Sequence, residues 1–423
     1  MKDSGIWMKT TQRTILSARI VFFPRKTGKE TQGKKTGSNP EFFPGEPDGL
    51  SEKKYIFLLS GLIINLFILQ SCQNTEEKSI QEYEKQFIEI CEKFEIYNGS
   101  MPNGWTGDIM VAKNGWVLAD RISYDGGKTW GNKIPALGGA GRVLDEITGD
   151  ILKLDPGGSG KKPENFMYRS KDNGLTWTKE VVVRHADVNG WIPVISGCEE
   201  GITLRYGTRK GRLLLPSRVL INYDAANDSL LPYHYSSANY SDDRGKTWYS
   251  SAPFPVAGTG EAALVELSDG TIYYNSRNHN RAGNRDVTWS FDGGETWQDH
   301  SVDPSLPDGP PNVYGCKGGL ARLEIEGYDV LIFSMNDNPN GPTAIHSTAG
   351  RINMTVWASF DGGRTWPVKR LVHKNGGYSH LAAGRPGTMS GGLIYLTTTD
   401  LYARFNLAWV TNGRDWTKYL NKK

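Results

Sequence analysis

Four side chains in the second half of the chain are of types that could perform acid–base or anion-binding chemistry. Tyr378 stands in the run Gly-Gly-Tyr-Ser, and Glu261 follows Gly-Thr-Gly at the start of an apolar, strand-like run. Arg277 ends that run, and Arg351 opens another. A guanidinium offers a permanent charge and a bidentate grip on a carboxylate. Each of the four is also typical of an ordinary strand residue, so their meaning depends on the elements that position them.

The cysteines and histidines give no sign of a metal or cofactor site. The four cysteines, at positions 72, 91, 198 and 316, are too few and too scattered for a zinc site or a disulfide framework. Cys198 and Cys316 could pair, but a buried free thiol is the expected state of each. His234 and His380 are more typical of rim or packing histidines than of catalysts. We therefore expect neither a metal nor an organic cofactor.

An internal repeat provides the framework that must position any such site. The pattern Ser-x-Asp-x-Gly-x-Thr-Trp, here called the Asp box, occurs five times, at residues 123–130, 170–177, 241–248, 290–297 and 359–366. Glycine supplies the positive φ of a tight turn, and aspartate can bond its own backbone two residues on. Threonine and tryptophan suit the start of the next strand, with the ring packed under the turn. A sixth, weaker copy is expected at residues 411–416.

The spacing of the boxes predicts an all-β fold. The tryptophans that end the boxes and the weaker copy stand at positions 130, 177, 248, 297, 366 and 416. A four-stranded propeller blade needs about 45–50 residues, and the two longer intervals leave room for insertions. We therefore predict a β-propeller in which the boxes stabilise blade corners and contact no substrate.

The charge of the chain is unevenly distributed. Residues 1–54 hold eleven Lys/Arg and six Asp/Glu, whereas the rest of the chain holds 38 and 40. A nearly neutral globular domain is not a nucleic-acid binder by charge. Nucleic acid is therefore excluded as an expected partner.

The N-terminal part predicts a targeting segment. Residues 1–50 show no sustained periodicity and are expected to be disordered or a mis-assigned start. Two lysines then precede the apolar run 55–69, which is followed by Gln-Ser-Cys72. This arrangement resembles a bacterial lipoprotein signal, in which Cys72 becomes the lipidated first residue. We predict such a signal at residues 51–72 and a location in the bacterial cell envelope, at the outer surface or in the periplasm. A retained membrane anchor is the alternative, although the run is short for a bilayer span.

Residues 73–97 are predicted to form a short helix that precedes the propeller. Apolar residues recur there at helical spacing among charges, at Ile80, Tyr83, Phe87, Ile88, Ile90 and Phe94. We expect this helix to act as a tether lying against the propeller, which would then span residues 98–423.

The segments between the boxes resemble a known family. Residues 261–277, from Glu-Ala-Ala-Leu-Val-Glu to Tyr-Asn-Ser-Arg, resemble the central block of the bacterial exo-α-sialidases (neuraminidases) with Asp-box, or BNR, repeats. Further segments fall in the order that this family shows, at residues 201–204, 211–216, 331–334, 351–356 and 377–381. The resemblance covers roughly residues 105–420. It implies a six-bladed β-propeller with its site at one end of the central axis.

The resemblance also implies roles for the four side chains. A sialic acid carries a carboxylate at its anomeric carbon, so a carboxylate nucleophile would approach against like charge, and sialidases use a tyrosine instead. In the family pattern Tyr378 is the nucleophile and Glu261 the base that takes its proton. Arg277 and Arg351 match two of the family's three carboxylate-binding arginines. Arg218 is a candidate for lining the cleft.

The chain departs from the family pattern in its first blade and its last. The family's first arginine belongs to an Arg-Ile-Pro motif. The most similar segment here is Ser-Met-Pro at residues 100–102, which lacks the arginine. The acid/base aspartate, expected on a loop before the first box, has Asp108 and Asp120 as candidates. Residues 393–400 lack the glutamate that braces the first arginine. Arg121 is a candidate for the missing charge.

Both losses concern partners in one interaction, which favours a divergent subfamily with a rebuilt carboxylate site. We predict a retaining exo-glycosidase of the sialidase type that hydrolyses terminal sialic acid, or a related acidic sugar, from glycoconjugates. Its partners would be sialylated or other acidic glycans and, through Cys72, a membrane. The alternatives are a non-catalytic glycan-binding surface propeller and a glycosidase acting on a different sugar acid.

Overall fold

The computed structural model describes residues 91, 93–101, 107–134, 137–224, 226–310, 313–325, 328–341 and 350–419. All of them belong to the unit Leu69–Lys423. Residues 1–90 lie outside the described residues, and with them the predicted signal segment, Cys72 and most of the predicted helix. Within the described ranges, no helix is long and apolar enough to cross a membrane.

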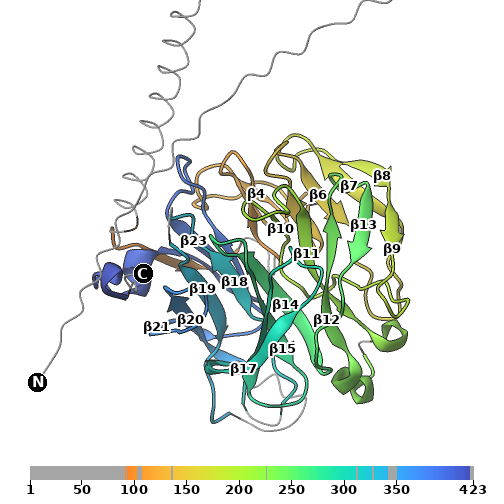
Figure 1. Cartoon of the computed structure of the whole chain (residues 1–423). Coiled ribbons are helices and arrows are strands. Elements are labelled where there is room, and N and C mark those ends of the chain that lie inside the picture. The colour runs from red at the N-terminus through yellow and green to blue at the C-terminus, as the bar shows by residue number, and fades with distance from the viewer. Residues whose placement is uncertain are drawn as a thin grey trace, which may run out of the picture. The chain divides into compact units, whose positions relative to one another are not determined.

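Six sheets form the blades of a propeller around a central axis (Figure 1). The strands of each blade are given from the inner strand outward. Blade 1 is β2 (Met110–Val111), β3 (Val117–Leu118) and β4 (Ile122–Ser123). Blade 2 is β5 (Arg142–Leu144), β6 (Ile151–Leu154), β7 (Phe166–Ser170) and β8 (Thr178–Val181). Blade 3 is β10 (Ile202–Thr203), β11 (Leu213–Val219), β12 (Tyr235–Ser241), β13 (Thr247–Ser250) and β9 (Val183–His185), with η1 (Ile221–Tyr223) and η2 (Asp228–Tyr233) between β11 and β12. The prediction of a six-bladed β-propeller is confirmed.

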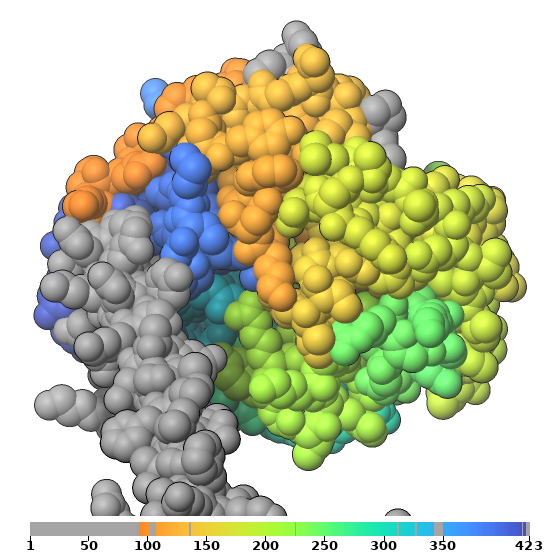
Figure 2. All heavy atoms as spheres, turned by 90° about the horizontal axis from the view of Figure 1, so that it is seen from above, coloured from red at the N-terminus to blue at the C-terminus, as the bar shows by residue number. Residues whose placement is uncertain are grey.

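The last three blades follow the same order. Blade 4 is β14 (Thr259–Glu266), β15 (Ile272–Asn278), β16 (Asn284–Ser290) and β17 (Gln298–Pro307), and blade 5 is β18 (Gly319–Arg322), β19 (Leu331–Asn336), β20 (Ile352–Ser359) and β21 (Val368–Asn375). Blade 6 is β22 (His380–Ala383), β23 (Leu393–Thr397), β24 (Tyr402–Asn406) and β1 (Ile96–Gly99), followed by α2 (Leu407–Val410) and η3 (Trp416–Tyr419). Seen from above, the blades surround a central hollow (Figure 2).

Strand β1 closes the ring, which corrects the sequence-based view of this segment. Ile96–Gly99 pairs antiparallel with β24, so the outer strand of the last blade comes from the start of the described chain. Ile96 and Tyr97 are therefore not helical, so the helix predicted for residues 73–97 does not reach residue 97; Cys91 is helical, and residues 73–90 lie outside the described residues. The reason is that β24 would otherwise expose unpaired backbone groups along its outer edge.

The antiparallel order of each blade gives the propeller two distinct ends. Each inner strand begins at what we call the start end and finishes at the far end. The second strand returns to the start end and the third leaves it again, so the turn between third and fourth strands lies at the far end. Five Asp boxes occupy these turns or, in blade 1, directly follow the third strand. They therefore lie opposite any site at the start end, as expected for structural elements.

Within each box the same hydrogen bonds recur. In box 359–366 the Ser359 hydroxyl donates to Asp361 at 2.8 Å and accepts the Gly363 N–H, while Asp361 accepts the N–H and the hydroxyl of Thr365. The weaker copy at residues 411–416 is not such a hairpin. It begins at the C-terminal cap of α2 and ends in η3, because β1 already supplies the fourth strand of blade 6.

We expect Asp361→Ala to destabilise the protein by about 1–2 kcal/mol, because it leaves the Thr365 and Arg364 N–H groups without their acceptor. The box lies at the far end, so kcat should stay near the wild-type value. Urea unfolding and kinetics on the same preparation check this. A large loss of kcat with unchanged stability would contradict a structural role.

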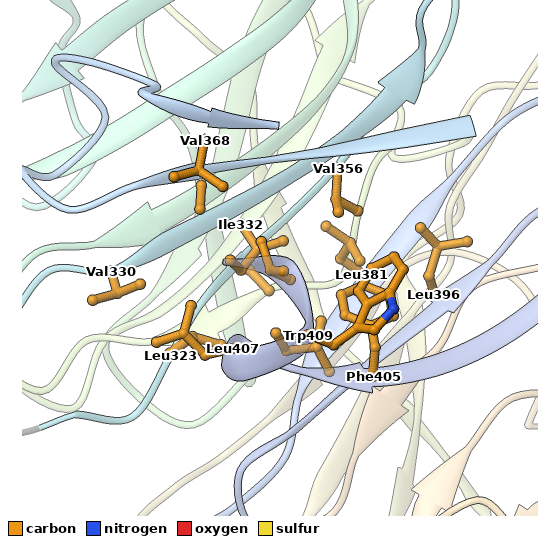
Figure 3. Packing of buried hydrophobic residues seen from close by; sticks show 14 of the residues in the cluster. Leu323, Val330, Ile332, Val356, Val368, Leu381, Leu396, Phe405, Leu407 and Trp409 are labelled. Atoms are coloured by element: carbon orange, nitrogen blue, oxygen red, sulfur yellow. The ribbon is translucent and has the colours of Figure 1, made fainter. Parts of the chain in front are cut away.

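The largest hydrophobic cluster joins the last two blades. Leu323, Ile332 and Val356 of blade 5 pack with Leu396 and Phe405 of blade 6 (Figure 3). The short helix α2 covers this cluster with Leu407 and Trp409, both buried. The interface between blades 5 and 6 is therefore apolar, and the segment that carries Tyr378 connects these two blades.

Candidate active site

The start end of the propeller brings together the four side chains selected from the sequence, although they come from three blades. Glu261 lies on β14 and Arg277 on β15, while Arg351 directly precedes β20 and Tyr378 precedes β22. Arg277 and Glu261 are buried, whereas Tyr378 is partly exposed. Residues more than one hundred positions apart thus meet because their strands begin or end at the same end of the axis.

Arg277 connects the two groups expected to react. Its Nη1 donates to Glu261 Oε2 at 2.5 Å and to the Tyr378 hydroxyl at 3.0 Å. Its Nε donates to the Tyr314 carbonyl at 2.6 Å, which fixes the plane of the guanidinium. One arginine therefore holds the glutamate and the tyrosine within a single hydrogen-bonded group.

Two further arginines surround this group. The Arg351 guanidinium lies over the Tyr378 ring, 4.8 Å from its centroid. Arg218 Nη1 lies 3.8 Å from Glu261 Oε1. A cavity of about 100 Å³ is lined by Arg277 and Arg351, together with Asp228, Tyr314 and Asn336. An anion entering this cavity would meet two guanidinium groups.

Local backbone features create the space for these side chains. The pairing of β14 with β15 shifts between Thr259 and Ala262, so Glu261 lies in a β-bulge, a feature that re-aims side chains near functional sites. Gly197 has φ +80°, and a Cβ there would stand 2.8 Å from Glu261 Cγ. Gly376 precedes the tyrosine segment, and a Cβ there would overlap Asn336 Oδ1. The glycines therefore permit close approach of neighbouring blades.

The charges at the site shift the pKa values of Glu261 and Tyr378 in opposite directions. Burial alone would raise the pKa of Glu261, but the charges of Arg277 and Arg218 lower it to about 2. The negative charge of Glu261, followed by burial, raises the pKa of the Tyr378 hydroxyl. The glutamate is therefore ionised and the tyrosine protonated near neutral pH.

The two aspartates proposed as acid lie in different surroundings. Asp108 is buried, with Oδ1 2.7 Å from His380 Nδ1 and 3.4 Å from Lys317 Nζ. Burial would raise its pKa, but the charges of His380 and Lys317 hold it far below the usual range. Asp120 lies in the β3–β4 turn at the start end, 3.3 Å from Arg121 Nε and 3.4 Å from Lys133 Nζ. Arg121 therefore pairs with Asp120, and its Nη1 donates to the Gly131 carbonyl.

Asp108 belongs to a buried group of charges at the start end of the axis. Lys317 is fully buried, and its Nζ lies 2.9 Å from Glu199 Oε2 and contacts the His380 ring. Glu199 Oε2 also lies 3.2 Å from His380 Nδ1. Although burial and Lys317 oppose it, the charges of Asp108 and Glu199 raise the pKa of His380. We call Asp108, Glu199, Lys317 and His380 the axial charge cluster.

Residues 113–390 of the chain match the family model described as "BNR repeat-like domain". The chain belongs to the BNR repeat-like domain family. The match covers the propeller from the first blade to the last, in agreement with the recurrent Asp boxes of this BNR domain.

Curated relatives of the BNR domain are sialidases. A sialidase from Micromonospora viridifaciens is 32% identical over 330 residues, which are 69% of this chain and 47% of that protein. A sialidase from Bacteroides fragilis is 32% identical over 226 residues, 51% of this chain and 36% of that protein. The chain therefore spans half or less of the length of these relatives. It is homologous to sialidases, which are glycoside hydrolases, and the predicted family is confirmed.

Solved structures support the fold. The Hadza microbial sialidase Hz136 aligns with a TM-score of 0.56 and 21% identity, covering 72% of this chain and 66% of that one. A leech intramolecular trans-sialidase aligns with a TM-score of 0.53 and 15% identity, covering 77% and 70%. At these identities the likeness concerns the propeller architecture of the BNR domain.

Sequence reasoning missed two members of the axial charge cluster, Glu199 and Lys317. A signal existed, because Glu199 and Glu200 form a charged pair directly before an inner strand. No sequence pattern, however, places Lys317 beside them. The expectation for the thiols is confirmed: Cys198 and Cys316 are buried and free. The Cys316 thiol donates to the Gly377 carbonyl at 3.4 Å, next to Tyr378.

His234 is a packing histidine of the BNR domain, and its burial has a consequence for stability. The ring is fully buried, and burial, together with the charge of Arg218, lowers the pKa of His234 to about 4. An unfolded histidine takes up its proton near pH 6.5. Acidification from pH 6.5 to 4 therefore favours the unfolded state, and the contribution of His234 is lost as the pH falls through this range.

We expect His234→Gln to remove this part of the acid sensitivity. Wild-type protein should lose about 2 kcal/mol more stability between pH 7 and 4.5 than the variant does. Urea unfolding of both proteins at both pH values measures the difference. Equal losses would show that His234 titrates normally in the folded state.

Proposed function

We propose that this protein is a retaining exo-glycosidase of the sialidase type, which hydrolyses terminal sialic acid or a related acidic sugar through a tyrosine nucleophile. The observation that carries the proposal is the single hydrogen-bonded group formed by Tyr378, Glu261 and Arg277, with Arg351 over the tyrosine ring. Homology to sialidases supports the same reaction class.

Arg277 and Arg351 would bind the carboxylate of the substrate. Both line the same cavity and contact Tyr378, and a guanidinium offers two parallel N–H donors to a carboxylate. The substrate would thereby place its anomeric carbon near the tyrosine hydroxyl. This binding needs no third arginine, although Arg218 lies on the other side of Glu261 and adds positive charge.

Binding of an anion would also change the proton balance between Glu261 and Tyr378. In the free protein Arg277 holds Glu261 ionised with a low pKa, which makes it a weak base. A substrate carboxylate that shares Arg277 weakens this ion pair and raises the pKa of Glu261. The glutamate can then take the tyrosine proton as the phenolic oxygen attacks the anomeric carbon. A covalent glycosyl-tyrosine forms, and water later releases the sugar with retention of configuration.

Asp120 is the acid that we propose for protonation of the leaving oxygen. It is on a turn at the start end and pairs with Arg121 and the exposed Lys133. Asp108 is the weaker candidate, since two buried cations hold it ionised and an ionised carboxylate has no proton to donate. Asp120→Asn should therefore lower kcat most for substrates with poor leaving groups, as measured with alkyl and aryl glycosides.

A non-catalytic glycan-binding propeller is the second candidate. The low pKa of Glu261 favours it, because a glutamate that stays paired with Arg277 cannot take the tyrosine proton. Such a site would bind acidic sugars through its arginines without cleaving them. A glycosidase for another sugar acid would use the same groups on a different ring.

The test uses the full chain with fluorogenic glycosides of sialic acid, of a deaminated keto sugar acid, of glucuronic acid and of galactose. We expect release from the sialic acid glycoside and none from the neutral galactoside. Release from another acidic sugar alone would move the assignment to that sugar. Binding of free sialic acid without release from any glycoside would establish the glycan-binding alternative.

We further propose that Cys72 carries a lipid and that the protein resides in the bacterial cell envelope. The charged, apolar and Ser-Cys order of residues 53–72 supports this. Cells expressing the protein with a labelled fatty acid should yield labelled wild-type protein and unlabelled Cys72→Ser protein. Equal labelling of both would exclude Cys72 as the lipidated residue.

A further inference from the structure

Glu199 contacts both segments that carry the proposed reacting groups. Its Oε1 accepts the Leu381 N–H at 2.7 Å, three residues after Tyr378. Its own N–H donates to the Ala262 carbonyl at 2.8 Å, one residue after Glu261. A single buried residue of blade 3 therefore joins the tyrosine segment of blade 6 to the glutamate strand of blade 4.

The Glu199 carboxylate is held in place by charge. Oε2 lies 2.9 Å from Lys317 Nζ and 3.2 Å from His380 Nδ1, while Asp108 pairs with the same two cations. All four side chains of the axial charge cluster are at most 8% exposed. Two carboxylates thus balance two cations, and the loss of either would leave an uncompensated buried charge.

The tyrosine segment is held by several hydrogen bonds, among them those of the Ser379 hydroxyl, which accepts the Gly319 N–H and donates to the Ser334 carbonyl. Gly377 exchanges hydrogen bonds with the Asn336 side chain before the tyrosine, and the Ser379 N–H donates to the Lys317 carbonyl after it. Leu381 is the next residue whose N–H is bound by a side chain, and that side chain is Glu199. The axial charge cluster therefore fixes the start of β22, three residues after Tyr378.

We infer that Glu199 is a positioning residue that sets the separation of Tyr378 from Glu261. The inference rests on the proposed function, in which these two side chains react with each other. Glu199 touches neither reacting group and acts through Leu381 and Ala262. A displacement of about 1 Å in a reacting group can cost on the order of 100-fold in rate without changing ground-state binding.

The test compares Glu199→Gln with Glu266→Gln in the full chain. Glu266 is a matched control on β14: it is buried, and its carboxylate accepts two backbone N–H groups, of Arg205 and Tyr206, but at the far end. We expect both variants to lose stability. Glu199→Gln alone should lower kcat by about 10- to 100-fold, with KM changed less than about threefold. Equal kcat in the two variants would overturn the inference.

Two further measurements keep the inference testable. If Glu199→Gln does not fold, Glu199→Ala with Lys317→Met removes opposite charges together and should show the same loss of kcat. Crystal structures of wild type and variant report the Tyr378–Glu261 separation without any activity. If wild type cleaves no sugar but the separation changes, the proposed function fails and the positioning role stands. An unchanged separation overturns the positioning role.

Discussion

Tyr378→Phe is expected to lose roughly 10³-fold or more in kcat, because the substitution removes the oxygen that forms the covalent intermediate. The ring and its contact with Arg351 remain, so the sugar should still bind and KM should change little. The variant should also fold normally, since the substitution removes only the hydroxyl that accepts a hydrogen bond from Arg277 and keeps the ring. Initial rates with a fluorogenic acidic glycoside measure both constants.

A suitable control for this variant is Tyr206→Phe. Tyr206 lies at the far end, where its side chain lines a separate cavity of about 170 Å³ and contacts Arg322. Its substitution also removes one tyrosine hydroxyl but should leave kcat and KM at the wild-type values. Comparable activity in Tyr378→Phe and wild type would mean that another group attacks, or that water attacks directly.

Arg277→Lys is the second variant with a large expected effect. Arg277 donates to Glu261, Tyr378 and the Tyr314 carbonyl at once, in the plane of one guanidinium. A lysine ammonium is a compact charge that cannot span these three acceptors. We expect kcat/KM to fall by about 10²- to 10³-fold, with a rise in KM from the weaker carboxylate grip and a fall in kcat from the displaced Glu261.

The matched control is Arg322→Lys, because Arg322 makes an ion pair with Asp329 and contacts the Tyr328 carbonyl at the far end. It should leave kcat/KM unchanged. If Arg277→Lys retained wild-type KM for the acidic sugar, the substrate carboxylate would have to bind elsewhere, and Arg351 with Arg218 would become the candidate pair.

The propeller and the pair Tyr378 and Glu261 could be predicted from the sequence because both depend on local patterns. Each Asp box contains its own hydrogen-bonding partners within eight residues, so its structure does not depend on distant residues. Glu261 and Arg277 lie in strand-like runs of the sequence, and Tyr378 precedes another such run. Antiparallel blade order then determines that these residues share one end of the axis.

The parts that could not be predicted depend on contacts between distant residues. The sequence of residues 96–99 contains no pattern that predicts the pairing of this short segment with β24, about three hundred positions away. The surroundings of Asp108 are similarly remote, since His380 and Lys317 belong to the last two blades. Burial of such charges is stable only when opposite charges meet, and pairing across blades leaves no periodic signal.

The central claim is that Tyr378 becomes covalently attached to the sugar. The most direct measurement incubates the full chain with a fluorinated sialic acid glycosyl fluoride, which forms the intermediate readily and releases it slowly, followed by peptide mass spectrometry. We predict one added sugar on the peptide that contains Tyr378, and none on the Tyr378→Phe protein. A sugar on any other residue, or cleavage of a sialic acid glycoside with inverted configuration and no adduct, would contradict this mechanism.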